Sequence, residues 1–207
     1  MSINDIQSLG RIPRLNLINS ISGYKPANLI GTIDTHGHTN LAIFSSVVHI
    51  GSNPAMLAFI MRPTTVERHT YDNIINQKHY TINHVSSQST AAAHYTSAKF
   101  ERMQSEFDEC GFMEQYYSGF DAPYVLDSPV QIGMEFIEEL SIKSNGTIMM
   151  IGAVKQLHLR SDIIENDHAL NLDVANVASI SGLNTYYKAT KIAKYPYARP
   201  GQFPTDQ

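Results

Sequence analysis

A short run of cationic and hydroxyl side chains precedes a helical pattern, and this combination can bind a phosphate. Residues 62–74 read RPTTVERHTYDNI, in which Tyr71 and Ile74 fall at helical spacing and Thr70 is expected to be the N-cap. The first turn of a helix presents unpaired N–H groups and a partial positive charge, so Arg68 beside it would help to bind an anion. On this segment alone, an ordinary capped helix with a solvated arginine is the favoured interpretation.

Two adjacent serines interrupt an apolar stretch upstream of that segment. Residues 40–54 read NLAIFSSVVHIGSNP, with Ser45 and Ser46 side by side. Small hydroxyls and exposed backbone amides near a phosphate site can hold the rest of a phosphorylated cofactor, with its ring hydrogen-bonded along the strand. The simpler interpretation is a β-bulge or the rim of a barrel. Together the two stretches indicate a ligand with one anionic end and one flat polar end.

Other residues that could carry chemistry are interpreted as structural. Asp34, His36 and His38 alternate as metal ligands on a strand would, but Gly37 between them is typical of a hairpin tip, so no metal is expected. Cys110 is the only cysteine, and a lone thiol is usually a packing residue. The chain has no G-x-G-x-x-G, P-loop or G-x-S-x-G motif, which argues against a Rossmann dehydrogenase, an NTPase and an α/β hydrolase. We therefore expect no metal, and no nucleophile at Cys110.

The composition excludes two classes of partner. The chain has 207 residues, 15 Lys plus Arg and 19 Asp plus Glu, and a net charge of -4. No long basic run is present, so nucleic acid is not an expected partner. No run of about 18 apolar residues is present either, so no membrane span is expected. Together with the lone cysteine and the lack of an apolar leader, this favours a cytoplasmic protein.

Hydrophobic periodicity predicts a chain dominated by strands. The strands expected are residues 28–33, 41–50, 56–61, 79–85, 130–142 and 147–154. The first two would form a hairpin around DTHGHTN, and 56–61 is apolar on both faces and should be central. Asn145-Gly146 predicts a hairpin between the last two strands, and a slip of phase near 137–139 predicts a β-bulge there.

Helices are expected between these strands. One should start near Thr70, and one or two should lie within residues 86–109, which are rich in Ala, Lys, Glu and Gln. Residues 110–129 are expected to form an ordered loop. Roughly six antiparallel strands then enclose a core, and a small closed barrel is the economical solution because it removes exposed sheet edges. No linker divides the chain, so residues 1–207 are expected to form a single domain.

The segment from Thr32 to Val85 resembles the flavin reductase-like family of FMN-binding split barrels. The residues that carry the resemblance are Gly37, Asn40, Ala42, Ser45, Pro54, Arg68, Thr70, Asn73, Ile74 and Asn83. The chain departs from the family at His69, where the family usually has Asp. A looser resemblance extends over residues 28–200, so the implied fold is mainly β: an antiparallel, Greek-key split β-barrel with inserted helices.

The resemblance implies a non-covalently bound FMN that takes hydride from NADH or NADPH and passes it to an electron acceptor. Flavins carry this chemistry themselves, and the protein supplies binding and orientation, so the resemblance implies no catalytic acid or base. The resemblance assigns phosphate contacts to Arg68, His69 and Thr70, with Arg62 as a further candidate. It assigns contacts to the ring and ribityl chain to Asn40, Phe44, Ser45, Ser46 and Val47. It also implies a homodimer, and a monooxygenase is a candidate partner.

Two other functions fit the same fold. One is a non-enzymatic FMN-binding electron carrier or redox sensor, and the other is an enzyme like the pyridoxamine phosphate oxidases. His94 and His158 could lie near the flavin and nicotinamide, but a surface position is the simpler expectation for each histidine.

Overall fold

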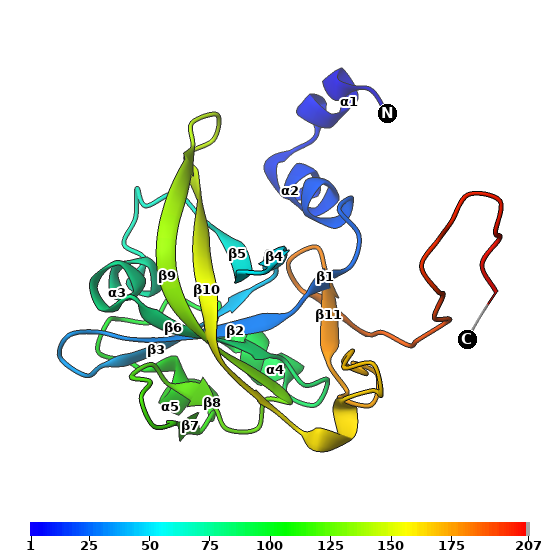
Figure 1. Ribbon diagram of the computed structural model, residues 1–207. Coiled ribbons are helices and arrows are strands. Elements are labelled where there is room, and N and C mark those ends of the chain that lie inside the picture. Colours follow the sequence, from blue (N-terminus) through cyan, green and yellow to red (C-terminus); the bar gives the residue numbers. More distant parts are fainter. Residues whose placement is uncertain (206–207) are drawn as a thin grey trace.

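Seven antiparallel strands form the body of the protein. The computed structural model describes residues 1–205 and orders these strands β3-β2-β6-β9-β10-β5-β4 (Figure 1). Their bounds are β2 (Asn28–Ile33), β3 (Thr39–Phe44), β4 (Val48–Ser52), β5 (Ala55–Met61), β6 (His79–His84), β9 (Val130–Ile142) and β10 (Thr147–Leu159). The two strands at the ends of this order, β3 and β4, follow each other along the chain. The short connection between them therefore brings the two edges of the sheet together, as the predicted split barrel requires.

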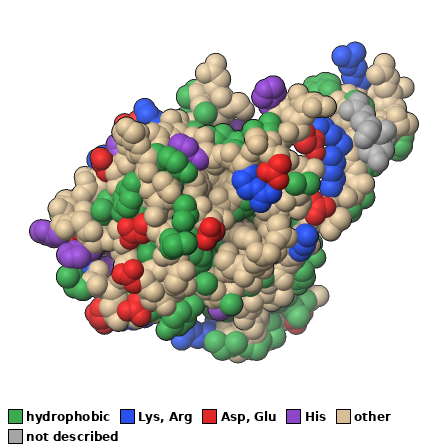
Figure 2. All heavy atoms as spheres, turned by 90° about the horizontal axis from the view of Figure 1, so that it is seen from below, with side chains coloured by type: hydrophobic (Ala, Val, Ile, Leu, Met, Phe, Trp, Pro, Cys, Tyr) green, Lys and Arg blue, Asp and Glu red, His purple; other side chains and the backbone are tan. Residues whose placement is uncertain are grey.

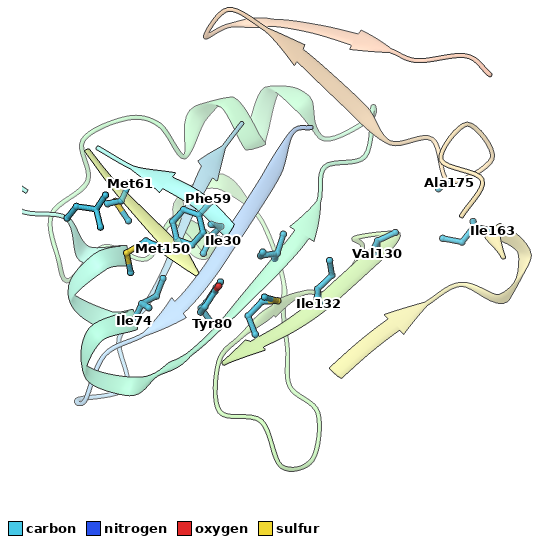
Figure 3. Close-up of a cluster of buried hydrophobic side chains, with 13 residues drawn as sticks. Ile30, Phe59, Met61, Ile74, Tyr80, Val130, Ile132, Met150, Ile163 and Ala175 are labelled. Atoms are coloured by element: carbon cyan, nitrogen blue, oxygen red, sulfur yellow. The ribbon is translucent and has the colours of Figure 1, made fainter. Parts of the chain in front are cut away.

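The strands are apolar at successive positions because both faces of the sheet are covered. Ile30, Ile82 and Ile132 pair across β2, β6 and β9 and belong to the cluster inside the barrel, which Figure 3 shows. Leu29 and Leu41 point to the opposite face and join a second cluster with residues of the surrounding segments. A strand buried on both faces carries a continuous apolar run instead of an alternating one.

Residues 1–205 also form five helices and two small sheets outside the barrel. The helices are α1 (Ile3–Ser8), α2 (Arg11–Ser20), α3 (His69–Gln77), α4 (Thr90–Tyr95) and α5 (Glu106–Cys110), with a 3-10 turn at Ser161–Ile163. One small sheet has the order β1-β11-β12, with β1 (Lys25–Pro26), β11 (Ala178–Ser181) and β12 (Thr185–Lys188). The other pairs β7 (Glu114–Gln115) with β8 (Tyr124–Val125). Helix α3 lies against β2, β3 and β6.

The long hairpin of β9 and β10 confirms two predictions from the sequence. Ile151 pairs with Glu138, but the next residue, Gly152, pairs with Phe136, so Ile137 is the extra residue of a β-bulge. Residues 143–146 form the turn, and Gly146 adopts a φ of 73°, a conformation that glycine reaches without steric cost. The hairpin rises above the rest of the barrel in Figure 1.

The other predicted elements agree with the structure except in two places. β5 lies between β10 and β4, which confirms that 56–61 is an interior strand, and residues 86–109 contain the two helices α4 and α5. The single strand predicted over 41–50 is wrong, because β3 ends at Phe44 and β4 starts at Val48. The predicted loop 110–129 is ordered, but it contains the short strands β7 and β8.

The surface carries scattered charges. Figure 2 shows acidic and basic side chains interspersed on the face that it presents, with no continuous basic patch there. Within residues 1–205, no helix combines the length and the apolarity needed to cross a membrane.

Candidate functional site

The connection between β3 and β4, residues 45–47, explains the paired serines. β3 pairs with β2 as far as Phe44, and from Val48 the chain pairs with Ala58 on β5. Between them the Ser46 hydroxyl donates to the carbonyl oxygen of Ile60 at 3.2 Å and accepts from the Ile60 N–H at 3.0 Å. The Ser46 side chain thus makes the two hydrogen bonds that the backbone of a neighbouring strand would make to Ile60. The polar backbone groups of Ile60 need such partners away from water.

This connection leaves polar groups available for a ligand. Among the described residues, no backbone N–H or C=O group of residues 45–47 takes part in a turn or loop hydrogen bond. The half-buried Ser45 hydroxyl makes no hydrogen bond to the described residues. A ligand lying along 45–47 could therefore bond to these amides, carbonyls and this hydroxyl without breaking the sheet.

The start of α3 is the second part of the site. Arg68 is the N-cap, with an extended backbone, and no side chain caps the helix. Its Nε donates to the carbonyl oxygen of Pro63 at 3.4 Å, and His69 follows as the first helical residue with a side chain that is 18% exposed. The uncapped N–H groups, the helix dipole and the arginine together favour an anion. The prediction that Thr70 is the N-cap is wrong by two residues.

The Thr70 hydroxyl instead makes a buried hydrogen bond that links α3 to β3. Thr70 is 5% exposed, and its hydroxyl accepts from Asn40 Nδ2 at 3.0 Å. Asn73, one helical turn further on, donates to Thr32 Oγ1 at 3.1 Å. Asn40 lies on β3 four residues before Phe44 and on the same face of that strand. The first of these buried bonds fixes the start of α3 against β3, the strand that leads into 45–47, and the second fixes it against the neighbouring β2.

The structure brings two of the predicted site residues, Asn40 and Thr70, into direct contact, and Arg68 and His69 directly precede Thr70 in the chain. Phe44 packs its ring into the barrel against Phe59, with centroids 5.0 Å apart, and Val47 also packs on the inner cluster. Arg62 follows the end of β5 and is exposed, with no ion pair among the described residues.

An ion-pair network beside α3 was not predicted. Arg102, in the loop between α4 and α5, places Nη2 2.8 Å from Glu67 Oε1 and 2.8 Å from Asp72 Oδ2. The hydrogen bond from Arg102 lowers the pKa of Glu67, and the bond to Glu67 raises the pKa of Arg102. No local pattern links residues that lie 30 or more positions apart in the sequence, so the sequence carries no signal for this contact.

His94 and His158 differ in environment. His94 is exposed, and its Nδ1 lies 3.3 Å from the Tyr186 hydroxyl. His158 is half-buried and stacks on Tyr117, with ring centroids 3.5 Å apart and planes 10° apart. Burial lowers the pKa of His158. The expectation of a surface position is therefore met by His94 and not by His158.

Asp34 organises the hairpin tip that also carries His36 and His38. Its Oδ1 accepts from the backbone N–H groups of both histidines, and its Oδ2 lies 3.1 Å from His38 Nδ1. The carboxylate is thus engaged within the turn. Within residues 1–205, no group of three or more His, Cys, Asp and Glu side chains is arranged to hold a metal ion.

Residues 24–177 match the model of the flavin reductase like domain. The chain is 40% identical to a proposed flavin reductase with a split barrel domain from Shewanella frigidimarina NCIMB 400, with a TM-score of 0.92 over 95% of this chain and 98% of that one. No curated protein matches the chain.

Two more distant structures share the fold. Nitrilotriacetate monooxygenase component B from Bacillus cereus is 16% identical, with a TM-score of 0.83 over 94% of this chain and 98% of that one. 2-Nitrobenzoate 2-nitroreductase NbaA from Pseudomonas fluorescens is 18% identical, with a TM-score of 0.81 over 99% of this chain and 98% of that one.

Proposed function

Because the chain belongs to the flavin reductase-like family, a family of flavin-dependent oxidoreductases, we propose that it is an FMN-dependent NAD(P)H:flavin oxidoreductase. Its residues 1–207 act as one flavin reductase-like domain. The flavin, when bound, supplies the hydride chemistry, and the protein supplies binding, orientation and the electrostatic environment.

The hydrogen bond between Asn40 and Thr70 is the observation that carries this proposal. It holds an uncapped helix start, suited to a phosphate, against a strand whose continuation at 45–47 has unpaired polar groups. FMN has these two ends, a phosphate and a flat ring with polar edges. The site residues fit the cofactor in chemical type, since one end is cationic and the other offers backbone and hydroxyl hydrogen bonds.

We assign each predicted residue a role on this basis. The phosphate would be held by Arg68, by His69 and by the first-turn N–H groups, with Arg62 as an added cation. Thr70 and Asn40 hold the helix start in place, because the hydroxyl of one accepts from the amide of the other.

The ring and ribityl chain would lie along Phe44, Ser45, Ser46 and Val47. Ser45 offers its hydroxyl, and Ser46 contributes its backbone, because its own hydroxyl is bonded to Ile60. Phe44 and Val47 anchor this segment to the inner cluster. No proton transfer by a side chain is needed, so the cofactor carries the reaction without a catalytic acid or base.

We further propose a cytoplasmic homodimer. The helices α1 and α2 bury no residue, and Ile12 and Ile21 are 61% and 68% exposed. At the other end of the chain, Tyr197 and Phe203 are 90% and 95% exposed, and both terminal segments extend away from the barrel in Figure 1. Apolar side chains presented in this way are suited to a second copy of the chain.

Nicotinamide nucleotide is the proposed electron donor, and a monooxygenase is a candidate consumer of the reduced flavin. The second assignment draws on the fold shared with the B component of nitrilotriacetate monooxygenase.

An absorbance spectrum of the purified protein tests the proposal. FMN is added first, and NADH or NADPH is then added under anaerobic conditions. Flavin bands that bleach on addition of either nucleotide are the expected result. Bound flavin that stays oxidised with both nucleotides would refute the reductase and favour the electron carrier, or an oxidase if pyridoxamine phosphate bleaches it. A protein that binds no FMN would refute all three functions.

A further inference from the structure

Two carboxylates lie beside the proposed phosphate site. Glu67 immediately precedes Arg68, and its Oε2 is 3.8 Å from His69 Nε2. Asp72 lies in the first turn of α3. A phosphate monoester carries nearly two negative charges at neutral pH, so two uncompensated carboxylates at this distance would oppose its binding.

Arg102 compensates both carboxylates at once. Its guanidinium donates to Glu67 Oε1 from Nε at 3.1 Å and from Nη2 at 2.8 Å, and Nη2 also donates to Asp72 Oδ2 at 2.8 Å. A planar guanidinium with several fixed donors can hold two carboxylates in defined positions, which a lysine ammonium does less well. Without Arg102, the approach to the helix would present two uncompensated carboxylates beside the arginines that are proposed to hold the phosphate, Arg68 and Arg62.

We propose that Arg102 is a positioning residue for the FMN phosphate: it neutralises Glu67 and Asp72 and holds their carboxylates in place beside the helix start. The proposal rests on the proposed function. Arg102 then acts through Glu67 and Asp72 instead of touching the cofactor, and it confers selectivity for a phosphorylated flavin over riboflavin, which has the same ring and ribityl chain but no phosphate.

A purely structural role predicts something different. If Arg102 only anchors the loop between α4 and α5 to α3, its loss would weaken the binding of both flavins equally or of neither. Removal of the Glu67 charge would then not restore the flavin affinity that was lost with Arg102.

The test measures the dissociation constants of FMN and riboflavin by flavin fluorescence titration, at low and at high salt. The variants are R102Q, E67Q, the double variant R102Q/E67Q, and R160Q as a matched control. Arg160 is more exposed than Arg102 but is likewise paired with a carboxylate, that of Asp162, on the segment that follows β10.

At low salt, R102Q should lose FMN affinity by about tenfold, the scale of one nearby, partly screened charge. Riboflavin affinity should stay unchanged, the loss should shrink at high salt, and E67Q should restore most of the FMN affinity in the double variant. R160Q should behave as wild type.

An unchanged ratio of FMN to riboflavin affinity in R102Q, or a loss that E67Q does not restore, would overturn the role of Arg102 while leaving the proposed function intact. Wild-type protein that binds FMN no better than riboflavin would overturn the phosphate site itself and Arg102's role with it.

Discussion

Replacement of Ser46 by alanine tests the connection that closes the barrel. The Ser46 hydroxyl makes two hydrogen bonds to the backbone of Ile60, one as donor at 3.2 Å and one as acceptor at 3.0 Å. Alanine removes both and leaves the N–H and C=O of Ile60 without these partners. Because 45–47 switches the chain from β2 to β5, this loss falls where the two edges of the sheet meet.

The expected cost follows from the two bonds. A typical hydrogen bond within a protein contributes about 0.5–1.5 kcal/mol to stability, so Ser46→Ala should lower the free energy of unfolding by about 1–3 kcal/mol. For a chain of this size, each kcal/mol corresponds to roughly 2–4 °C in melting temperature. A loss of about 2 kcal/mol therefore lowers the melting temperature by about 4–8 °C.

Urea unfolding followed by circular dichroism measures this change, with Ser45→Ala as the matched control. Ser45 is adjacent, has the same side chain and makes no hydrogen bond to the described residues, so its replacement should leave stability nearly unchanged. Equal stability of the two variants would refute the role given to the Ser46 hydroxyl.

Three further predictions concern the site, the core and pH. Arg68→Ala should weaken FMN binding by about 1–3 kcal/mol, the scale of a charge-assisted hydrogen bond, and unchanged affinity in calorimetry would place the phosphate elsewhere. Gly152→Ala should destabilise the barrel by at least about 1–3 kcal/mol in urea unfolding, because a Cβ there would lie 2.3 Å from the Tyr80 hydroxyl. Burial lowers the pKa of His84 to about 4. As the pH falls below about 6.5, this histidine is therefore protonated in the unfolded chain before it is protonated in the folded one. The free energy of unfolding should then drop by about 1.4 kcal/mol per pH unit down to about pH 4. His84→Leu should remove that part of the slope, and an identical pH dependence in the variant would contradict this prediction.

Local patterns in the sequence were enough to predict most of the barrel. The apolar run of 28–33, the turn at Asn145-Gly146 and the phase slip at Ile137 each depend on neighbouring residues only, so their predictions were correct. The break at 45–47 depends on which strand lies next to the chain. Phe44 before it and Val48 after it continue a strand pattern, and only the serines signalled a change.

The site could be predicted in its parts but not in its contacts. The cationic helix start and the serines were each visible as short stretches, yet capping preferences misplaced the N-cap at Thr70. That hydroxyl is instead used by Asn40, 30 residues earlier in the chain. Arg102 was missed for the same physical reason, since its carboxylate partners become neighbours only through the packing of the loop on α3.

The position of bound FMN is the most direct test of the central claim. A crystal structure of the complex should place the phosphate within hydrogen-bond distance of Arg68 and the first-turn N–H groups of α3, with the ring and ribityl chain along residues 44–47. A phosphate bound elsewhere, or a ring that makes no contact with residues 44–47, would contradict it.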